Sequence, residues 1–149
     1  MAMKCRVVTP DKSYYDGDAI KVVVPAWDGE MAFFANHAPL IAKLGHGVMR
    51  IEPADRPGAV ELLAIHEGFV KVKDNEVLVL AGGAETQDNI DKDEAKAALE
   101  AAQKAVTENR PPKISDEEFA DLEKALVHAG VRYAVAHGSA PAISLPMSE

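Results

Sequence analysis

The hydrophobic period of this sequence changes within one short segment. Residues 77–99 read VLVLAGGAETQDNIDKDEAKAAL. The apolar run at the start is typical of a strand, and Gly82 and Gly83 end it. Asp91 then stands where it can cap a helix, with Glu94 at the third helical position to complete a capping box. The chain is therefore predicted to pass from β-structure to α-helix here.

Before this segment the chain has the pattern of many short strands. Met3, Cys5 and Val7 alternate with Lys4 and Arg6, the period of a half-buried strand. Further apolar runs follow, with turn signals about every 8 to 12 residues. These signals are Asp16-Gly17-Asp18, Gly45-His46-Gly47, Pro57-Gly58, Glu67-Gly68 and Asp74-Asn75. Because no long helical pattern intervenes, we predict an antiparallel β-sandwich or barrel rather than a parallel βαβ fold.

After the segment, apolar residues recur at three- and four-residue spacing in two stretches. The first is a narrow, mostly alanine stripe, and Pro111 and Pro112 end it. Ser115 with Glu118 forms a second capping box, and Gly138 is expected to follow the end of the second helix. We predict an α-helical hairpin. The expected domains are a β-sandwich over 1–88, the helical hairpin over 89–138 and a loose tail over 139–149.

The totals argue against several functions. Sixteen basic and 24 acidic residues give a net charge of −8, which would repel nucleic-acid backbones and anionic lipid. No apolar run approaches the roughly 20 residues that a bilayer span needs. Lys4 and Arg6 interrupt any signal peptide, so we expect a soluble chain that reaches a membrane only through partners. The single cysteine, Cys5, excludes an internal disulfide.

Side chains that could carry catalysis form no known pattern. The five histidines, His37, His46, His66, His128 and His137, lack the spacing of a zinc site. His46 between two glycines reads as a turn residue. Neither a hydrolase elbow nor a phosphate loop is present, and Glu30, Glu61 and Glu67 read as scattered surface acids. We predict that this chain is not an enzyme and has no metal or cofactor.

Phe33 and Phe34 are adjacent, in an apolar stretch that ends at a polar turn. Neighbouring residues on a strand point to opposite faces, so the two rings cannot both enter one core. One of them is expected at a sheet junction or exposed, where it would offer a docking surface.

This stretch also carries a family resemblance. Asp28-Gly29-Glu30, followed by Asn36-His37-Ala38-Pro39-Leu40-Ile41, resembles the G-E-x-G-x-x-P-G-H-A-P-L segment of ATP synthase epsilon subunits. Further similar stretches occur in the family's order over residues 3–91. They are Val7-Val8-Thr9-Pro10, Tyr15-Asp16-Gly17, Gly47-Val48-Met49-Arg50-Ile51, Gly68-Phe69-Val70-Lys71-Val72 and residues 75–81.

The resemblance implies a two-sheet sandwich of about ten strands in the central stalk of a proton-translocating ATP synthase. Such a subunit grips the gamma subunit, rests on the rotor ring of c subunits and lies at the cytoplasmic face of the bacterial inner membrane. Glu30 and His37 match rotor-facing positions, and Phe33 and Phe34 join them as candidate contacts to the ring or to gamma. Ala35-Asn36 replaces the family's Pro-Gly, although asparagine tolerates positive φ.

The helical part departs further from the family. Members that bind ATP carry an I/L-D-x-x-R-A motif. Here Ile90 and Asp91 keep the start of the motif, but Glu94 stands where arginine should face phosphate. Nucleotide binding is therefore doubtful. The resemblance also implies contacts to the alpha and beta subunits and regulation of ATP hydrolysis through the hairpin. However, inhibitory members have a basic second helix, and here Lys124 and Arg132 stand among five acids.

Two other function classes stay open on the sequence alone. A small-molecule sensor built on a β-sandwich would need a concave pocket with convergent polar groups. An enzyme of the cupin type would need an H-x-H metal pair, and the sequence has none.

Overall fold

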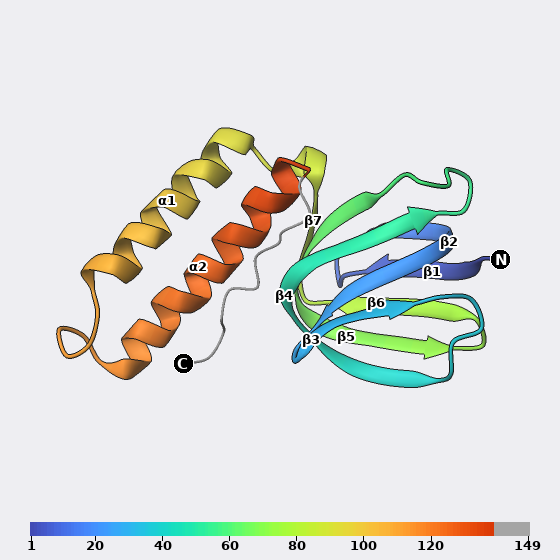
Figure 1. Cartoon of the computed structure of the whole chain (residues 1–149), viewed down its shortest axis with the longest axis horizontal. Helices are drawn as coiled ribbons and strands as arrows, with labels where there is room; N and C mark the ends of the chain where they lie inside the picture. The colour runs from blue at the N-terminus through green and yellow to red at the C-terminus, as the bar shows by residue number, and fades with distance from the viewer. Residues whose placement is uncertain (139–149) are drawn as a thin grey trace. The chain divides into compact units, whose positions relative to one another are not determined.

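The computed structural model describes residues 1–138 (Figure 1). The chain divides into two compact units, one ending at Thr86 and the other beginning at Gln87. The tail expected over 139–149 lies outside the described residues. Each unit is considered by itself below.

The first unit is the predicted β-sandwich, built from one sheet that folds over on itself (Figure 1). The strand order is β1-β6-β5-β4-β2-β3, with β7 beside β5 and a further pairing of β1 with β2. All pairings are antiparallel except that of β1 with β6. The strands are β1 (Met3–Val8), β2 (Ser13–Ala26), β3 (Gly29–Phe33), β4 (Leu40–Pro53), β5 (Glu61–Lys73), β6 (Glu76–Ala81) and β7 (Ala84–Thr86).

Residues 1–138 therefore contain seven strands, and the expected count of about ten is not confirmed. Several predicted turns lie inside long strands. Gly45-His46-Gly47 continues β4, where His46 pairs with His66. His46 as a turn residue is therefore wrong. A Cβ at Gly47 would lie 2.3 Å from the Cβ of Pro25, so glycine is needed there because β4 and β2 approach closely.

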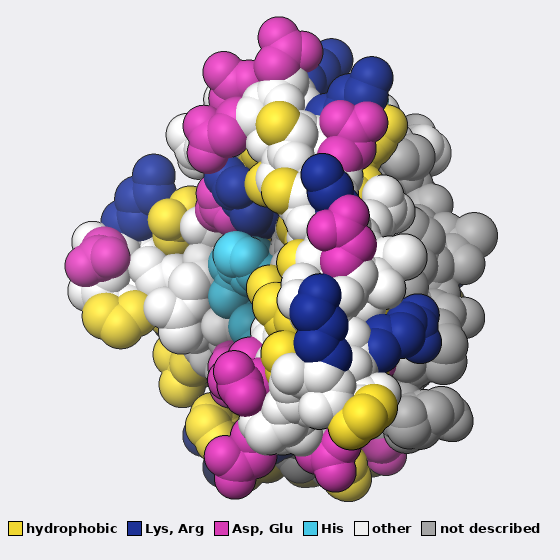
Figure 2. Space-filling view, turned by 90° about the vertical axis from the view of Figure 1, so that its left-hand side faces the viewer, with side chains coloured by type: hydrophobic (Ala, Val, Ile, Leu, Met, Phe, Trp, Pro, Cys, Tyr) yellow, Lys and Arg dark blue, Asp and Glu magenta, His cyan; other side chains and the backbone are white. Residues whose placement is uncertain are grey.

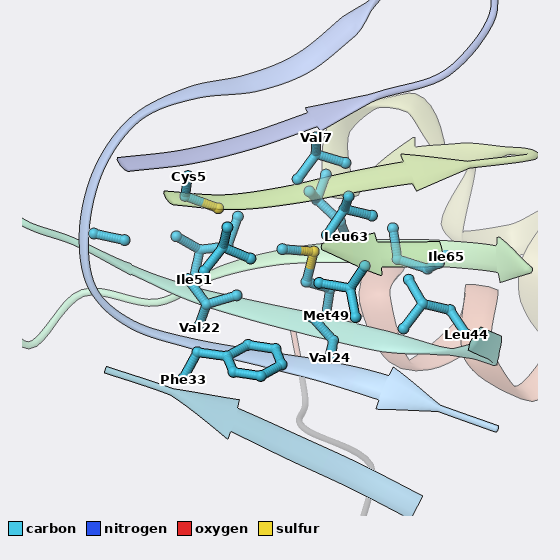
Figure 3. Packing of buried hydrophobic residues seen from close by; sticks show 14 of the residues in the cluster. Cys5, Val7, Val22, Val24, Phe33, Leu44, Met49, Ile51, Leu63 and Ile65 are labelled. Atoms are coloured by element: carbon cyan, nitrogen blue, oxygen red, sulfur yellow. The ribbon is translucent and has the colours of Figure 1, made fainter. Parts of the chain in front are cut away.

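The core of this unit consists of apolar side chains from both layers (Figure 3). Among the described residues, no polar or charged residue is buried. Cys5 is fully buried, and burial, followed by the charge of Asp16, raises the pKa of its thiol to about 12. Because only the thiolate is reactive, Cys5 is an inert core residue at neutral pH.

The second unit contains a short 3₁₀ turn, η1 (Gln87–Asn89), and the two predicted helices, α1 (Lys92–Glu108) and α2 (Asp116–Ala136). Asp91 caps α1 by accepting bonds from the N–H groups of Asp93 and Glu94. The predicted capping box of Ser115 and Glu118 is present at the start of α2.

The ends of the two helices are also defined by local contacts. Gly138 has φ of 68° and directly follows His137, the C-cap residue of α2, as expected. An ion pair of 3.9 Å between Glu94 and Arg132 joins the first turn of α1 to the last turns of α2.

None of the helices in residues 1–138 is long and apolar enough to cross a membrane.

Candidate functional site

The side chains of β3 alternate between the core and the surface. Phe33 is fully buried, whereas the side chain of Phe34 is 53% exposed. The prediction that the two rings separate is confirmed. Phe33 was also expected to be a contact residue, but a partner cannot reach its ring inside the core. Of this pair, only Phe34 offers a docking surface, and Lys21 lies over its ring at 5.8 Å.

Glu30 lies near the other end of β3 and is held by an arginine. Both carboxylate oxygens accept bonds of 3.1 Å from the two terminal nitrogens of Arg50 on β4. This fork geometry fixes the orientation of the carboxylate, although an exposed pair stabilises the fold by only about 0–1 kcal/mol. Since a strand rises about 3.3 Å per residue, Glu30 and Phe33 are roughly 10 Å apart along β3.

His37 stands in the turn after β3 and is half-buried. Its ring meets the ring of Phe33 edge-on, with centroids 5.0 Å apart. Nδ1 donates a hydrogen bond of 2.7 Å to the carbonyl of Ala38, since a carbonyl oxygen can only accept. Asn36 has φ of 63°, so the expected tolerance of asparagine for this turn is confirmed. The structure thus places Glu30 and His37 at opposite ends of one strand.

A second surface of the sandwich was not predicted. Ile41, Phe69 and Leu80 are 70%, 55% and 49% exposed, and they come from the neighbouring strands β4, β5 and β6. Phe69 lies directly opposite Leu80, and also opposite Lys43. We call Ile41, Phe69 and Leu80 the outer apolar face. The alternation of β5 was a usable signal, because Val70 and Val72 enter the core and Phe69 must then point outward.

The remnant nucleotide motif has structural contacts of its own. Ile90 is buried, the carboxylate of Asp91 caps α1, and Glu94 pairs with Arg132.

On the face shown in Figure 2, acidic and basic side chains are interspersed with apolar ones. The first turn of α2 contains the acidic residues Asp116, Glu117 and Glu118, whose negative charges interact favourably with the positive end of the helix dipole.

An open cleft of about 590 Å³ lies where the β4–β5 loop meets the start of β2. Its lining includes Asp16, Asp18, Asp55 and Glu61, with Arg56 as the single basic residue. Burial, then nearby negative charges, raise the pKa of Tyr15 beside it. A sensor site would be mainly apolar with a few polar groups, so this cleft does not favour that alternative.

Histidines and carboxylates also meet on the paired strands β4, β5 and β7. The rings of His46 and His66 are 5.8 Å apart, and His66 Nε2 lies 3.0 Å from a carboxylate oxygen of Glu85. His46 Nε2 lies 3.4 Å from Glu67. Within residues 1–138, no group of three or more histidine, cysteine or acidic residues could hold a metal ion.

The sandwich matches a known family model. The model describes the β-sandwich domain of the ATP synthase delta/epsilon chain, and it matches residues 2–87. The chain is 41% identical over 108 residues to the ATP synthase epsilon chain of Thermosynechococcus vestitus, covering 72% of this chain and 76% of that one. The chain belongs to the ATP synthase epsilon family. It is therefore an accessory subunit and not the catalytic one.

A second relative and a solved structure are also similar to this chain. The epsilon chain of Acaryochloris marina is 34% identical over 119 residues, covering 80% of this chain and 84% of that one. A chain in the cryo-EM structure of the Euglena gracilis mitochondrial ATP synthase, which holds OSCP, F1 and the c-ring, has a TM-score of 0.73. It is 21% identical, and the match covers 89% of this chain and 80% of that chain. At this identity, the match shows the same fold.

Proposed function

We propose that this chain links the gamma subunit to the membrane rotor ring in the central stalk of a proton-translocating ATP synthase. Its membership in the epsilon family supports this role, as does its structural similarity to a chain from an F1 and c-ring assembly. The observation that carries the proposal is the outer apolar face. Three large apolar side chains are exposed on adjacent strands, which is typical of a docking surface.

The outer apolar face is the proposed contact for the gamma subunit. Ile41, Phe69 and Leu80 already lie on hydrogen-bonded strands, so a partner need not order them on binding. Lys43 and Lys71 lie on the same strands, opposite Phe69 and Ile41, and favour a partner with acidic residues around an apolar centre. Phe34 is a second contact of the same kind, directly after the separate edge strand β3.

The rotor ring is proposed to meet Glu30 and His37. The two residues lie at opposite ends of β3, so they form two contact points rather than one cluster. Glu30 is held by Arg50, and His37 by Phe33 and Ala38, so both are presented in fixed orientations. Fixed contacts suit a subunit that transmits rotation without slip. In this assembly the chain would lie peripherally at the cytoplasmic face of a bacterial inner membrane.

The two helices are proposed to act as a hairpin that contacts the alpha and beta subunits and modulates ATP hydrolysis. Its charge argues for a weak electrostatic effect, since one of the two cations of α2, Arg132, already pairs with Glu94. Nucleotide binding at Ile90, Asp91 and Glu94 remains doubtful, because Glu94 places a carboxylate where the motif has an arginine facing phosphate, and Arg132 already pairs with that carboxylate. We propose no cofactor.

The test of this function is direct binding to the gamma subunit. Titration calorimetry of the full chain with purified gamma should show a one-to-one complex at micromolar concentration. Co-purification with gamma and the ring from membranes should agree. A chain that gives no binding heat and does not co-purify would refute the central-stalk role.

A further inference from the structure

The turn between β5 and β6 contacts two distant parts of the chain through one residue. Asn75 Oδ1 accepts a hydrogen bond of 2.8 Å from the backbone N–H of Asn36. Asn75 Nδ2 donates one of 3.0 Å to the carbonyl of Ala2, and the backbone carbonyl of Asn75 accepts one of 3.1 Å from Lys4. Asn75 therefore joins the turn after β3, the N-terminal segment and its own turn.

These contacts depend on two unusual backbone conformations. Asn36 and Asn75 have φ of 63° and 60°, a region that asparagine tolerates better than most residues. Asn36 lies beyond the end of β3, where the pairing with β2 has stopped at Phe33, and the side-chain amide of Asn75 provides the acceptor for its N–H. His37 is the next residue, so the bond to Asn36 also constrains the backbone position from which the imidazole side chain extends.

We propose that Asn75 is the positioning residue of the turn over 35–38 that presents His37. This inference rests on the proposed contact between His37 and the rotor ring. Asn75 need not touch the ring. It holds the turn at Asn36, while the contact of His37 with Phe33 holds the next residue. A turn held by contacts to other strands and turns deforms less under load than one held only by its own backbone.

Substitutions at the same turn separate these contacts. Asn75→Gly accepts the positive φ but removes both side-chain bonds, whereas Asn75→Asp keeps an acceptor for Asn36 and loses the donor to Ala2. Asp74→Asn combined with Asn75→Asp keeps the net charge of the chain. The matched control is Asp74→Gly, because Asp74 is exposed, lies in the same turn and has φ of 52°.

The first measurement is amide hydrogen exchange at Asn36 in the full chain by NMR. Loss of one hydrogen bond should speed exchange roughly fivefold in Asn75→Gly. The Asn75→Asp variants and Asp74→Gly should stay within about twofold of the parent, because each keeps an acceptor for Asn36. An unchanged rate in Asn75→Gly, or an equal rise in Asp74→Gly, would overturn the proposal.

The second measurement is proton-driven ATP synthesis by the assembled enzyme. Asn75→Gly and His37→Ala should each lower synthesis, and the double variant should be no worse than His37→Ala, because both act on one turn. Losses that multiply in the double variant would place the effect of Asn75 elsewhere and refute it. If His37→Ala leaves synthesis unchanged while exchange at Asn36 responds as expected, the rotor contact fails but Asn75 still positions the turn.

Discussion

Replacing Phe69 by serine should weaken binding to the gamma subunit strongly while leaving the fold intact. Phe69 is the centre of the outer apolar face, with Lys43 and Leu80 as its cross-strand neighbours. Its ring is 55% exposed in the isolated chain, so much of its contact area is available to a partner. The core below it is formed by Val70 and Val72, which the substitution does not touch.

The size of the effect follows from that exposed area. An aromatic side chain offers about 200 Å², so the 55% that is exposed in Phe69 corresponds to about 110 Å². At about 25 cal/mol per Å², burying this area contributes about 2.8 kcal/mol, or about a hundredfold in Kd.

The assay is titration calorimetry of the parent, Phe69→Ser and Val60→Ser chains with gamma. Val60 is the matched control, because it is 57% exposed and lies in the loop between β4 and β5. Urea unfolding of each variant checks that the folded state is retained. If Phe69→Ser binds gamma as tightly as the parent, or if Val60→Ser loses as much affinity, the outer apolar face is not the contact.

Four other outcomes are expected. Alanine at Glu30 or His37 should lower proton-driven ATP synthesis without unfolding the chain, and unchanged synthesis in both variants would contradict the ring contact. The isolated chain should bind ATP more weakly than the low micromolar range, and Glu94→Arg should tighten any residual binding seen by calorimetry. Deleting residues 90–149 should activate ATP hydrolysis to the same extent at low and high salt, whereas activation that vanishes as salt rises would show that charge holds the helices. The pKa of Cys5 is raised from its ordinary value of 9.0 to about 12 in the folded chain, so only the unfolded thiol ionises between these two pH values. The free energy of unfolding should therefore fall by about 1.4 kcal/mol per pH unit in this range because of Cys5. Urea titrations of Cys5→Ala should lack this contribution.

Local patterns determined much of this protein without the structure. The change from period 2 to helical spacing around Gly82 and Gly83 separated strands from helices, because periodicity reports which face of an element is buried. Local sequence also predicted the capping box of Ser115 and Glu118 and the tolerance of Asn36 for a positive φ. Each depends on residues within a few positions of one another.

The tertiary structure decided what depends on distant partners. Gly45-His46-Gly47 has the composition of a turn, yet it stays in a strand because His66 and Ile65 pair with His46 and Gly47. Likewise, the order of two adjacent phenylalanines does not say which one faces the core, and the closure of the sheet over Phe33 settles it. The bonds of Asn75 reach residues 39 and 73 positions away. Local sequence patterns cannot predict such hydrogen bonds, because the bonds form only when the folded sheet brings separate turns together.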